Sequence, residues 1–129
     1  MTDTRKERAE HGLKTVARIN GPAAAEQQAR LRSIYPPFAD WVEQSAYGDI
    51  LGREDLSLRD RELATVAALT ALGNAAPQLK AHVRGALNNG LSREQICEVI
   101  MQMAVYAGVP AAINAMAVAK DVFDEKSPA

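Results

Sequence analysis

The sequence has few of the residues that mark disulfide-linked, metal-binding or thiol-dependent proteins. Its 129 residues include one cysteine, Cys97, and two histidines. A single thiol cannot form an internal disulfide, which fits a reducing compartment. No His, Cys or carboxylate group has the spacing of metal ligands, and the isolated glycines form no phosphate-binding loop. We therefore expect a cytoplasmic protein without a metal site.

Charge and hydropathy argue against two further classes of partner. The 15 basic and 16 acidic side chains give a formal net charge of −1. They are mostly interspersed, so the chain lacks the basic surface that binds nucleic acid or an anionic membrane. No uninterrupted apolar helix approaches the roughly 18 residues needed to span a bilayer. Arg5, Lys6 and Arg8 are followed by no apolar segment, so we expect no secretory signal.

Helical periodicity and helix caps run along the whole chain, and no segment alternates in the manner of a half-buried strand. We predict one all-α domain over residues 1–129 with about six helices, in which residues 1–37 form a helical N-terminal extension that packs on the core. The predicted helices cover residues 4–19, 22–34, a short stretch after Pro36–Pro37, 58–72, 77–88, 93–107 and 110–124. Tyr47–Asp55 reads as a loop with Gly48 and Gly52 as its turn residues.

Two predicted helices indicate that the chain assembles with itself. Leu63–Leu72 is apolar or small on every face, which predicts burial all round. The last helix carries small residues that permit close helix approach, namely Ala111, Ala112, Ala115, Ala117 and Ala119. One small domain has little capacity to cover both helices. We therefore expect a homo-oligomer.

Three polar residues in apolar context are candidates for chemistry. Glu62 directly precedes the most apolar segment, where a carboxylate either interacts with the helix dipole or has a functional use. Gln78 and His82 lie four residues apart and share one helix face. An imidazole can transfer a proton near neutral pH, and a glutamine can orient it or a substrate oxygen. The alternative for His82 is a hydrogen-bonded core histidine.

The remaining candidates are less specific. Tyr106, near a helix end, and Trp41 and Tyr47, beside the predicted loop, are candidate substrate-binding residues, although aromatic packing is the simpler use of each. Cys97 has no second cysteine and no histidine within a helical turn, so it reads as a small core residue. His11, in a charged helix, is expected to be solvated.

The order of several short motifs is specific in combination. A Gln-Leu-x-x-His element at Gln78–His82 precedes Asn88–Asn89–Gly90 and a Tyr-Ala-Gly-x-Pro element at Tyr106–Pro110. Accompanying segments are Tyr47–Ile50, Arg61–Ala64, Ala71–Asn74, Gly85–Leu87 and Glu94–Ile96. In this order and spacing the motifs resemble the carboxymuconolactone decarboxylase family over about residues 38–125.

The resemblance implies a fold, an assembly and a reaction. The fold is the helical bundle of the alkylhydroperoxidase D-like proteins, which assemble as trimers or hexamers. The reaction is a cofactor-independent lyase step of aromatic catabolism, the decarboxylation of 4-carboxymuconolactone or a related small carboxylated lactone. Glu62 and His82 would be its catalytic proton-transfer residues. The peroxidase relatives carry a Cys-x-x-Cys pair before the histidine, whereas Ala75–Gln78 contains no cysteine, so we expect no thiol peroxidase.

Two other functions stay open at this point. One is a different proton-transfer or elimination reaction on the same scaffold, and the other is a non-catalytic oligomer that binds a small molecule. Glu62 and His82 converging on one pocket, closed by a neighbouring subunit, would favour an enzyme. A His82 fully enclosed by aliphatic side chains would favour the binding protein. Glu62 lies 13 residues before Ala75 and His82 only 7 after it, so the turn alone does not place them face to face.

Overall fold

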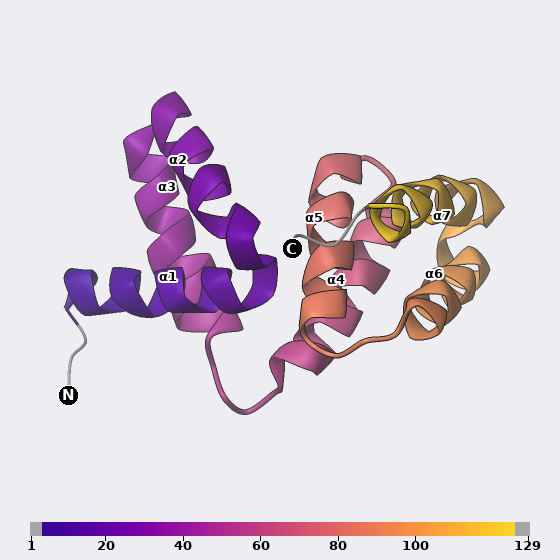
Figure 1. The fold of residues 1–129 in the computed structure, drawn as a ribbon, viewed down its shortest axis with the longest axis horizontal. Coiled ribbons are helices and arrows are strands. Elements are labelled where there is room, and N and C mark those ends of the chain that lie inside the picture. The colour runs from indigo at the N-terminus through magenta and orange to yellow at the C-terminus, as the bar shows by residue number, and fades with distance from the viewer. Residues whose placement is uncertain (1–3, 126–129) are drawn as a thin grey trace. The chain divides into compact units, whose positions relative to one another are not determined.

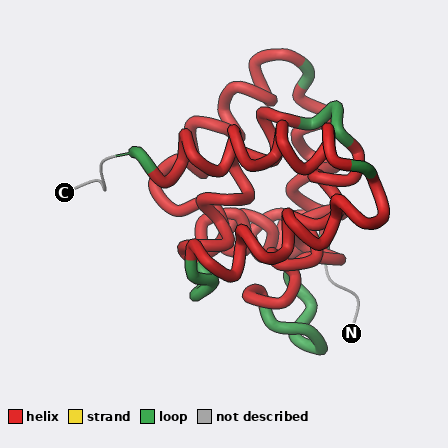
Figure 2. The backbone as a smooth tube through the Cα atoms, turned by 90° about the vertical axis from the view of Figure 1, so that its right-hand side faces the viewer, coloured by secondary structure: helices red, strands yellow, loops and turns green. Residues whose placement is uncertain are grey.

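The computed structural model describes residues 4–125, and every secondary-structure element in that range is helical. Figure 1 shows the order of these helices and Figure 2 the short loops between them. The elements are α1 (Arg5–Asn20), the 3₁₀ turn η1 (Gly21–Ala23), α2 (Ala24–Ile34), α3 (Pro36–Trp41), the π-helical η2 (Val42–Leu51), α4 (Leu58–Leu72), α5 (Ala76–Asn88), α6 (Arg93–Ala107) and α7 (Val109–Phe123). The predicted all-α class is confirmed.

The helices group into two compact units along the chain. The N-terminal unit covers Met1–Leu58 and the C-terminal unit covers Arg59–Ala129. In the N-terminal unit, α1 packs along η2, and α2 packs on α3. In the C-terminal unit, α7 packs on both α5 and α6.

Several helix ends follow the residues that the sequence uses as stop and start signals. Ser92 and Gln95 form a capping box at the start of α6, each side chain bonded to the other residue's backbone N–H. Gly108, with a φ of 97°, ends α6. Pro110 lies in the first turn of α7, where a missing N–H costs nothing.

The predicted loop Tyr47–Asp55 is wrong in its first half, because η2 continues to Leu51. Gly48 is buried and serves a helix–helix contact: a Cβ added there would lie 2.7 Å from the backbone oxygen of Arg8. At Gly12 an added Cβ would lie only 1.7 Å from the backbone oxygen of Glu43. The two glycines therefore let α1 and η2 meet at backbone contact. Gly52, in the turn after η2, fits the prediction.

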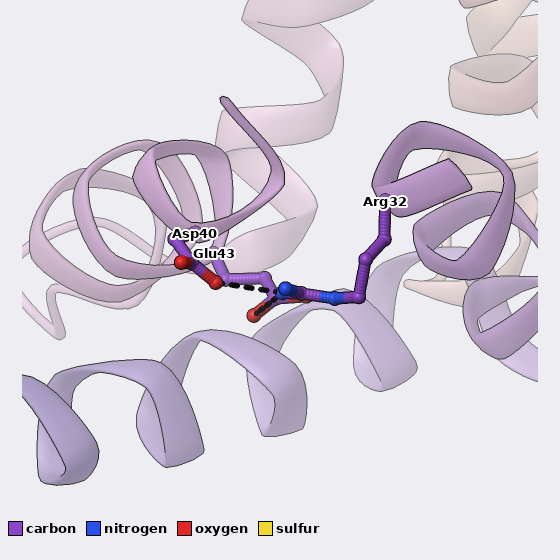
Figure 3. Close-up of polar contacts among 3 residues, drawn as sticks. All are labelled: Arg32, Asp40 and Glu43. Atoms are coloured by element: carbon purple, nitrogen blue, oxygen red, sulfur yellow. Dashed lines mark hydrogen bonds and ion pairs between the residues drawn. The ribbon is translucent and has the colours of Figure 1, made fainter. Parts of the chain in front are cut away.

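An ion-pair cluster that was not predicted from the sequence joins three helices of the N-terminal unit. Figure 3 shows Arg32 of α2 reaching Asp40 of α3 and Glu43 of η2. Arg32 Nη2 donates to Asp40 Oδ1 at 2.8 Å and to the two carboxylate oxygens of Glu43 at 3.1 and 3.0 Å. The hydrogen bonds to Asp40 and then Glu43 raise the pKa of Arg32. Glu43 is buried, so this pairing offsets the cost of enclosing its charge.

The C-terminal unit contains a continuous apolar core. Its buried members are Val66, Leu79, Val83, Ala86, Leu91, Ile96, Ile100, Ala112, Ala115, Ala119 and Val122. Within α4, burial follows one face through Glu62, Val66 and Thr70. Leu63 and Leu72 are 36% and 64% exposed. The predicted burial of Leu63–Leu72 on all faces is therefore wrong for a single chain.

Within residues 4–125, no helix is both long enough and apolar enough to cross a bilayer.

The close crossing of α1 and η2 predicts a large cost for one added methyl group. We expect Gly12→Ala to destabilise the protein by about 3 kcal/mol or more, because its Cβ meets backbone that can move only with the helix. Gly73→Ala is the control: an added Cβ there has no neighbour within 4 Å, and only the left-handed φ of 73° opposes it, at about 1–2 kcal/mol. Urea unfolding of both variants measures the difference. An equal loss of unfolding free energy in the two variants would contradict the close crossing of α1 and η2.

Candidate active site

The candidate site lies in the hairpin formed by α4 and α5. Glu62 is in the second turn of α4, and His82 is in the middle of α5. Residues 73–75 connect the helices, and Gly73 takes the positive φ that the turn requires. Pro77 lies in the first turn of α5, where its fixed φ suits a helix start. The hairpin turns α5 back along α4 and brings Glu62 and His82 together.

Glu62 and His82 form a direct hydrogen bond. His82 Nδ1 lies 2.9 Å from Glu62 Oε2. The Glu62 side chain is fully buried, and that of His82 is 14% exposed. Their unequal distances from the connecting turn do not prevent this contact. The two side chains are thus in contact, although residue spacing alone did not predict this. The imidazole also remains partly accessible to solvent.

The second carboxylate oxygen of Glu62 is unusual. Oε1 is buried and has no hydrogen-bond partner among the described residues. An enclosed carboxylate oxygen without a donor costs free energy. A stability role alone would favour an apolar side chain at this position. A buried polar atom without a partner calls for an explanation, and a catalytic role is one.

The hydrogen bond determines which imidazole nitrogen is available. A carboxylate oxygen accepts, so His82 Nδ1 carries its hydrogen and donates it to Glu62. Nε2 is then the nitrogen that can take up a proton from a ligand or give one to it. A carboxylate that orients an imidazole in this way fixes both its tautomer and its direction.

The other predicted site residues lie apart from this contact. Gln78 is exposed in the first turn of α5, one helical turn before His82. Tyr106 is 78% exposed near the end of α6. Trp41 and Tyr47 belong to the N-terminal unit. Trp41 is 57% exposed and stacks on Phe38, while Tyr47 is half-buried in η2.

A small hollow lies at the other end of the hairpin. It is lined by Leu69, Thr70, Gly73, Ala75, Ala76, Leu79, Ala111, Asn114, Ala115 and Val118. Its volume of about 30 Å³ has room for roughly two water molecules. Neither Glu62 nor His82 lines it, so it is no substrate pocket for this pair. Within residues 4–125, no three His, Cys, Asp or Glu side chains gather where they could hold a metal ion.

The chain is thus an all-α protein with a buried Glu–His pair on a helical hairpin, a combination of groups that can transfer a proton. Comparison with known proteins gives the family. Residues 36–121 match the carboxymuconolactone decarboxylase family. The chain belongs to that family.

Three relatives align over most of their length. A 4-carboxymuconolactone decarboxylase of Acinetobacter baylyi is 30% identical over 121 residues, which cover 93% of this chain and 90% of the relative. A nitrosuccinic acid decarboxylase of Metarhizium robertsii is 29% identical over 118 residues, covering 90% and 81%. An uncharacterized 15.0 kDa protein of Paracoccus denitrificans is 33% identical over 113 residues, covering 86% and 84%.

The two histidines are expected to have opposite tautomers. His82 bonds Glu62 through Nδ1, whereas His11 approaches the carbonyl oxygen of Gly52 through Nε2 at 3.2 Å. Both acceptors are oxygens, so the neutral forms should carry hydrogen on Nδ1 in His82 and on Nε2 in His11. Nitrogen chemical shifts of ¹⁵N-labelled histidine at alkaline pH distinguish the two, with His11→Gln assigning the signals. Hydrogen on Nε2 of neutral His82 would contradict the site geometry.

Proposed function

We propose that this protein is a cofactor-independent decarboxylase of a small carboxylic acid, with His82 as proton donor and Glu62 as the residue that orients and charges it. The hydrogen bond between Glu62 Oε2 and His82 Nδ1 carries the proposal. It leaves Nε2 as the imidazole atom that faces the reaction. Because His82 is not fully enclosed, the arrangement favours an enzyme over a binding protein with a core histidine.

The proposed reaction has two steps and needs one proton. The bond between the carboxylate and its carbon breaks, carbon dioxide leaves, and the electron pair stays on the substrate as a delocalised carbanion. His82 Nε2–H then donates its proton to a carbon of the delocalised carbanion, which forms the new C–H bond. Neutral His82 takes up a proton from solvent, and Glu62 compensates the imidazolium charge while it exists. One carboxylate and one proton therefore give the product and carbon dioxide.

The names of two relatives support the substrate class. One is a decarboxylase of 4-carboxymuconolactone and the other of nitrosuccinic acid. In both compounds the electrons released by decarboxylation can be delocalised, into the lactone system or the nitro group. Such a substrate needs no cofactor as an electron sink. We propose a substrate of this kind here, with the carboxylated lactone as the first candidate.

Gln78 is proposed as a positioning residue. It shares a face of α5 with His82, and its exposed amide can hydrogen-bond a substrate oxygen without competing for the bond between His82 and Glu62.

Removing either member of the pair should reduce turnover strongly. We expect His82→Gln and Glu62→Gln each to lower kcat by roughly 100-fold or more, the usual effect of losing an acid–base group. Carbon dioxide release from 4-carboxymuconolactone and nitrosuccinate is the assay. In deuterated water, the product should gain one deuterium, on a carbon over which the carbanion was delocalised.

Two matched controls use the same substitutions elsewhere. His11→Gln replaces the other histidine, in the N-terminal unit, and Glu98→Gln replaces an exposed glutamate of α6. Both should retain turnover within about twofold. Circular dichroism checks that all four variants fold. Full activity in both His82→Gln and Glu62→Gln would eliminate the assigned pair, and absence of carbon dioxide release across a wider panel of such acids would eliminate the decarboxylase.

Thiol chemistry should play no part. Cys97 is half-buried on α6, and the sequence has no other cysteine to resolve an oxidised thiol. We expect Cys97→Ser to leave decarboxylation unchanged and the wild type to show no thiol-dependent peroxide turnover. A coupled peroxidase assay measures the second point. Peroxide consumption that disappears in Cys97→Ser would overturn this expectation.

A further inference from the structure

The N-terminal unit has a polar hollow of its own, which lies between α1 and the end of η2. It is lined by charged side chains and glycines, namely Arg8, His11, Gly48, Asp49, Gly52 and Arg53. Its volume of about 400 Å³ lies in the range of sites that bind small molecules, which starts at roughly 300 Å³. The hollow shares no residue with the Glu62–His82 pair.

A second hollow adjoins the first along α1. Its volume is about 240 Å³, and it shares Gly52 and Arg53 with the first. Four residues of α1 line the two hollows at intervals of three or four positions, namely Arg8, His11, Thr15 and Arg18. This spacing places all four on one face of the helix. The two hollows together are called the α1 trough.

The α1 trough has an excess of positive charge, whereas the whole chain has a formal net charge of −1. Its charged lining residues are three arginines and two acids, namely Arg8, Arg18, Arg53, Asp49 and Glu54. With neutral histidine, this leaves an excess of one positive charge. The planar guanidinium group of arginine matches the oxygen atoms of a carboxylate or a phosphate, so the trough favours an anion.

Arg8 is held in place before any ligand arrives. Its Nε and Nη2 atoms donate to the two carboxylate oxygens of Asp49 at 3.0 and 2.5 Å, across the hollow from α1 to η2. The hydrogen bond from Arg8 lowers the pKa of Asp49, which keeps the partner of the guanidinium ionised. A side chain that is already ordered loses little conformational entropy when a ligand binds.

Arg53 supplies a second guanidinium, and its ion pair with Asp55 restrains it little. It lies in the turn after η2, and its side chain is 61% exposed. Arg53 Nη2 contacts Asp55 Oδ2 at 3.1 Å, and the side chain of Asp55 is 85% exposed. Surface ion pairs of this kind contribute little free energy. An anion in the trough can therefore compete with Asp55 for this guanidinium.

We propose that the α1 trough is a binding site for a small anion, which Arg8 and Arg53 hold by its carboxylate or phosphate oxygens. The excess of one positive charge suits a ligand with one anionic group. His11 and Gly52 form the wall beside the ligand, and His11 reports on occupation of the site. Binding here does not depend on the proposed decarboxylation, because the trough and the Glu62–His82 pair have no residue in common.

Calorimetric titration with inorganic phosphate and, separately, with glycolate tests the site and distinguishes the two kinds of anionic oxygen. At constant ionic strength, at least one of the two should bind saturably, with one site per chain. We expect Arg8→Gln and Arg53→Gln each to weaken binding roughly tenfold, the usual effect of losing a hydrogen bond to a charged group. Arg53 lies in an exposed turn, so its variant tests the site even if Arg8→Gln loosens the contact between α1 and η2.

Two matched controls use the same kinds of substitution outside the trough. Arg30→Gln replaces an exposed arginine of α2, and His82→Gln removes the candidate catalytic imidazole. Both should bind the anion within about twofold of wild type. Circular dichroism checks the helicity of every variant. Equal weakening in Arg30→Gln would show a general effect of charge, and loss of binding in His82→Gln would place the anion at the Glu62–His82 pair; either result would overturn the proposal.

Nuclear magnetic resonance of ¹⁵N-labelled histidine locates the bound anion. His11 lines the trough, whereas His82 does not. Phosphate should shift the ring-nitrogen signals of His11 saturably, with the same dissociation constant as in calorimetry. In Arg53→Gln the shift of His11 should need roughly ten times more phosphate. A shift confined to His82, a shift of His11 that never saturates, or no shift at all would mean adventitious ion association only and would refute the site.

Discussion

The hydrogen bond between Glu62 and His82 is the contact on which the functional interpretation depends. It joins α4 and α5 through two polar side chains in a unit that has an apolar core. For stability alone, a fully buried carboxylate with one unpartnered oxygen is a poor choice, because an apolar side chain of similar volume avoids the desolvation cost. Proton transfer, in contrast to stability, would explain why a glutamate and a histidine are paired here. Glu62 then supplies a charge at the place where the imidazole becomes positive, and the buried setting strengthens that interaction.

The sequence predicted both members of this pair, for different reasons. His82 follows Gln78 at helical spacing, and Glu62 stands at the entrance of the most apolar segment. Their contact was harder to predict, because it depends on how the helices pack and on the turn at residues 73–75, and not on residue spacing. Helix ends governed by local chemistry, such as both ends of the helix over residues 93–107, were predicted correctly. Such helix ends depend only on residues that are close in the sequence, so capping preferences predict them well.

The errors share a physical cause. Gly48 was read as a turn residue, yet its missing side chain serves a contact with a helix more than thirty positions earlier. The buried pairing of Arg32 with Glu43 likewise depends on three helices meeting. Leu63–Leu72 was expected to be buried on all faces because its composition is apolar, but composition does not say which atoms cover which face. In one chain the fully buried residues of α4 are Glu62, Val66 and Thr70. Long-range packing, and not local preference, decided each of these cases.

In the proposed chemistry, proton delivery and substrate selectivity depend on different residues. Proton delivery can be the same for different substrates, whereas the residues that select a substrate have to differ. Proton delivery to a carbanion needs one oriented imidazole and one charge to support it, whatever group delocalises the electrons. A lactone and a nitro compound differ in shape and in hydrogen-bond acceptors, and both occur among the substrates named for this chain's relatives. The Glu62–His82 pair would therefore suit either substrate. Selectivity has to come from the side chains around His82 Nε2, of which Gln78 is the first candidate. Substrate preference should then change with substitutions at Gln78 far more than with substitutions in the pair, which set the rate for every acid alike.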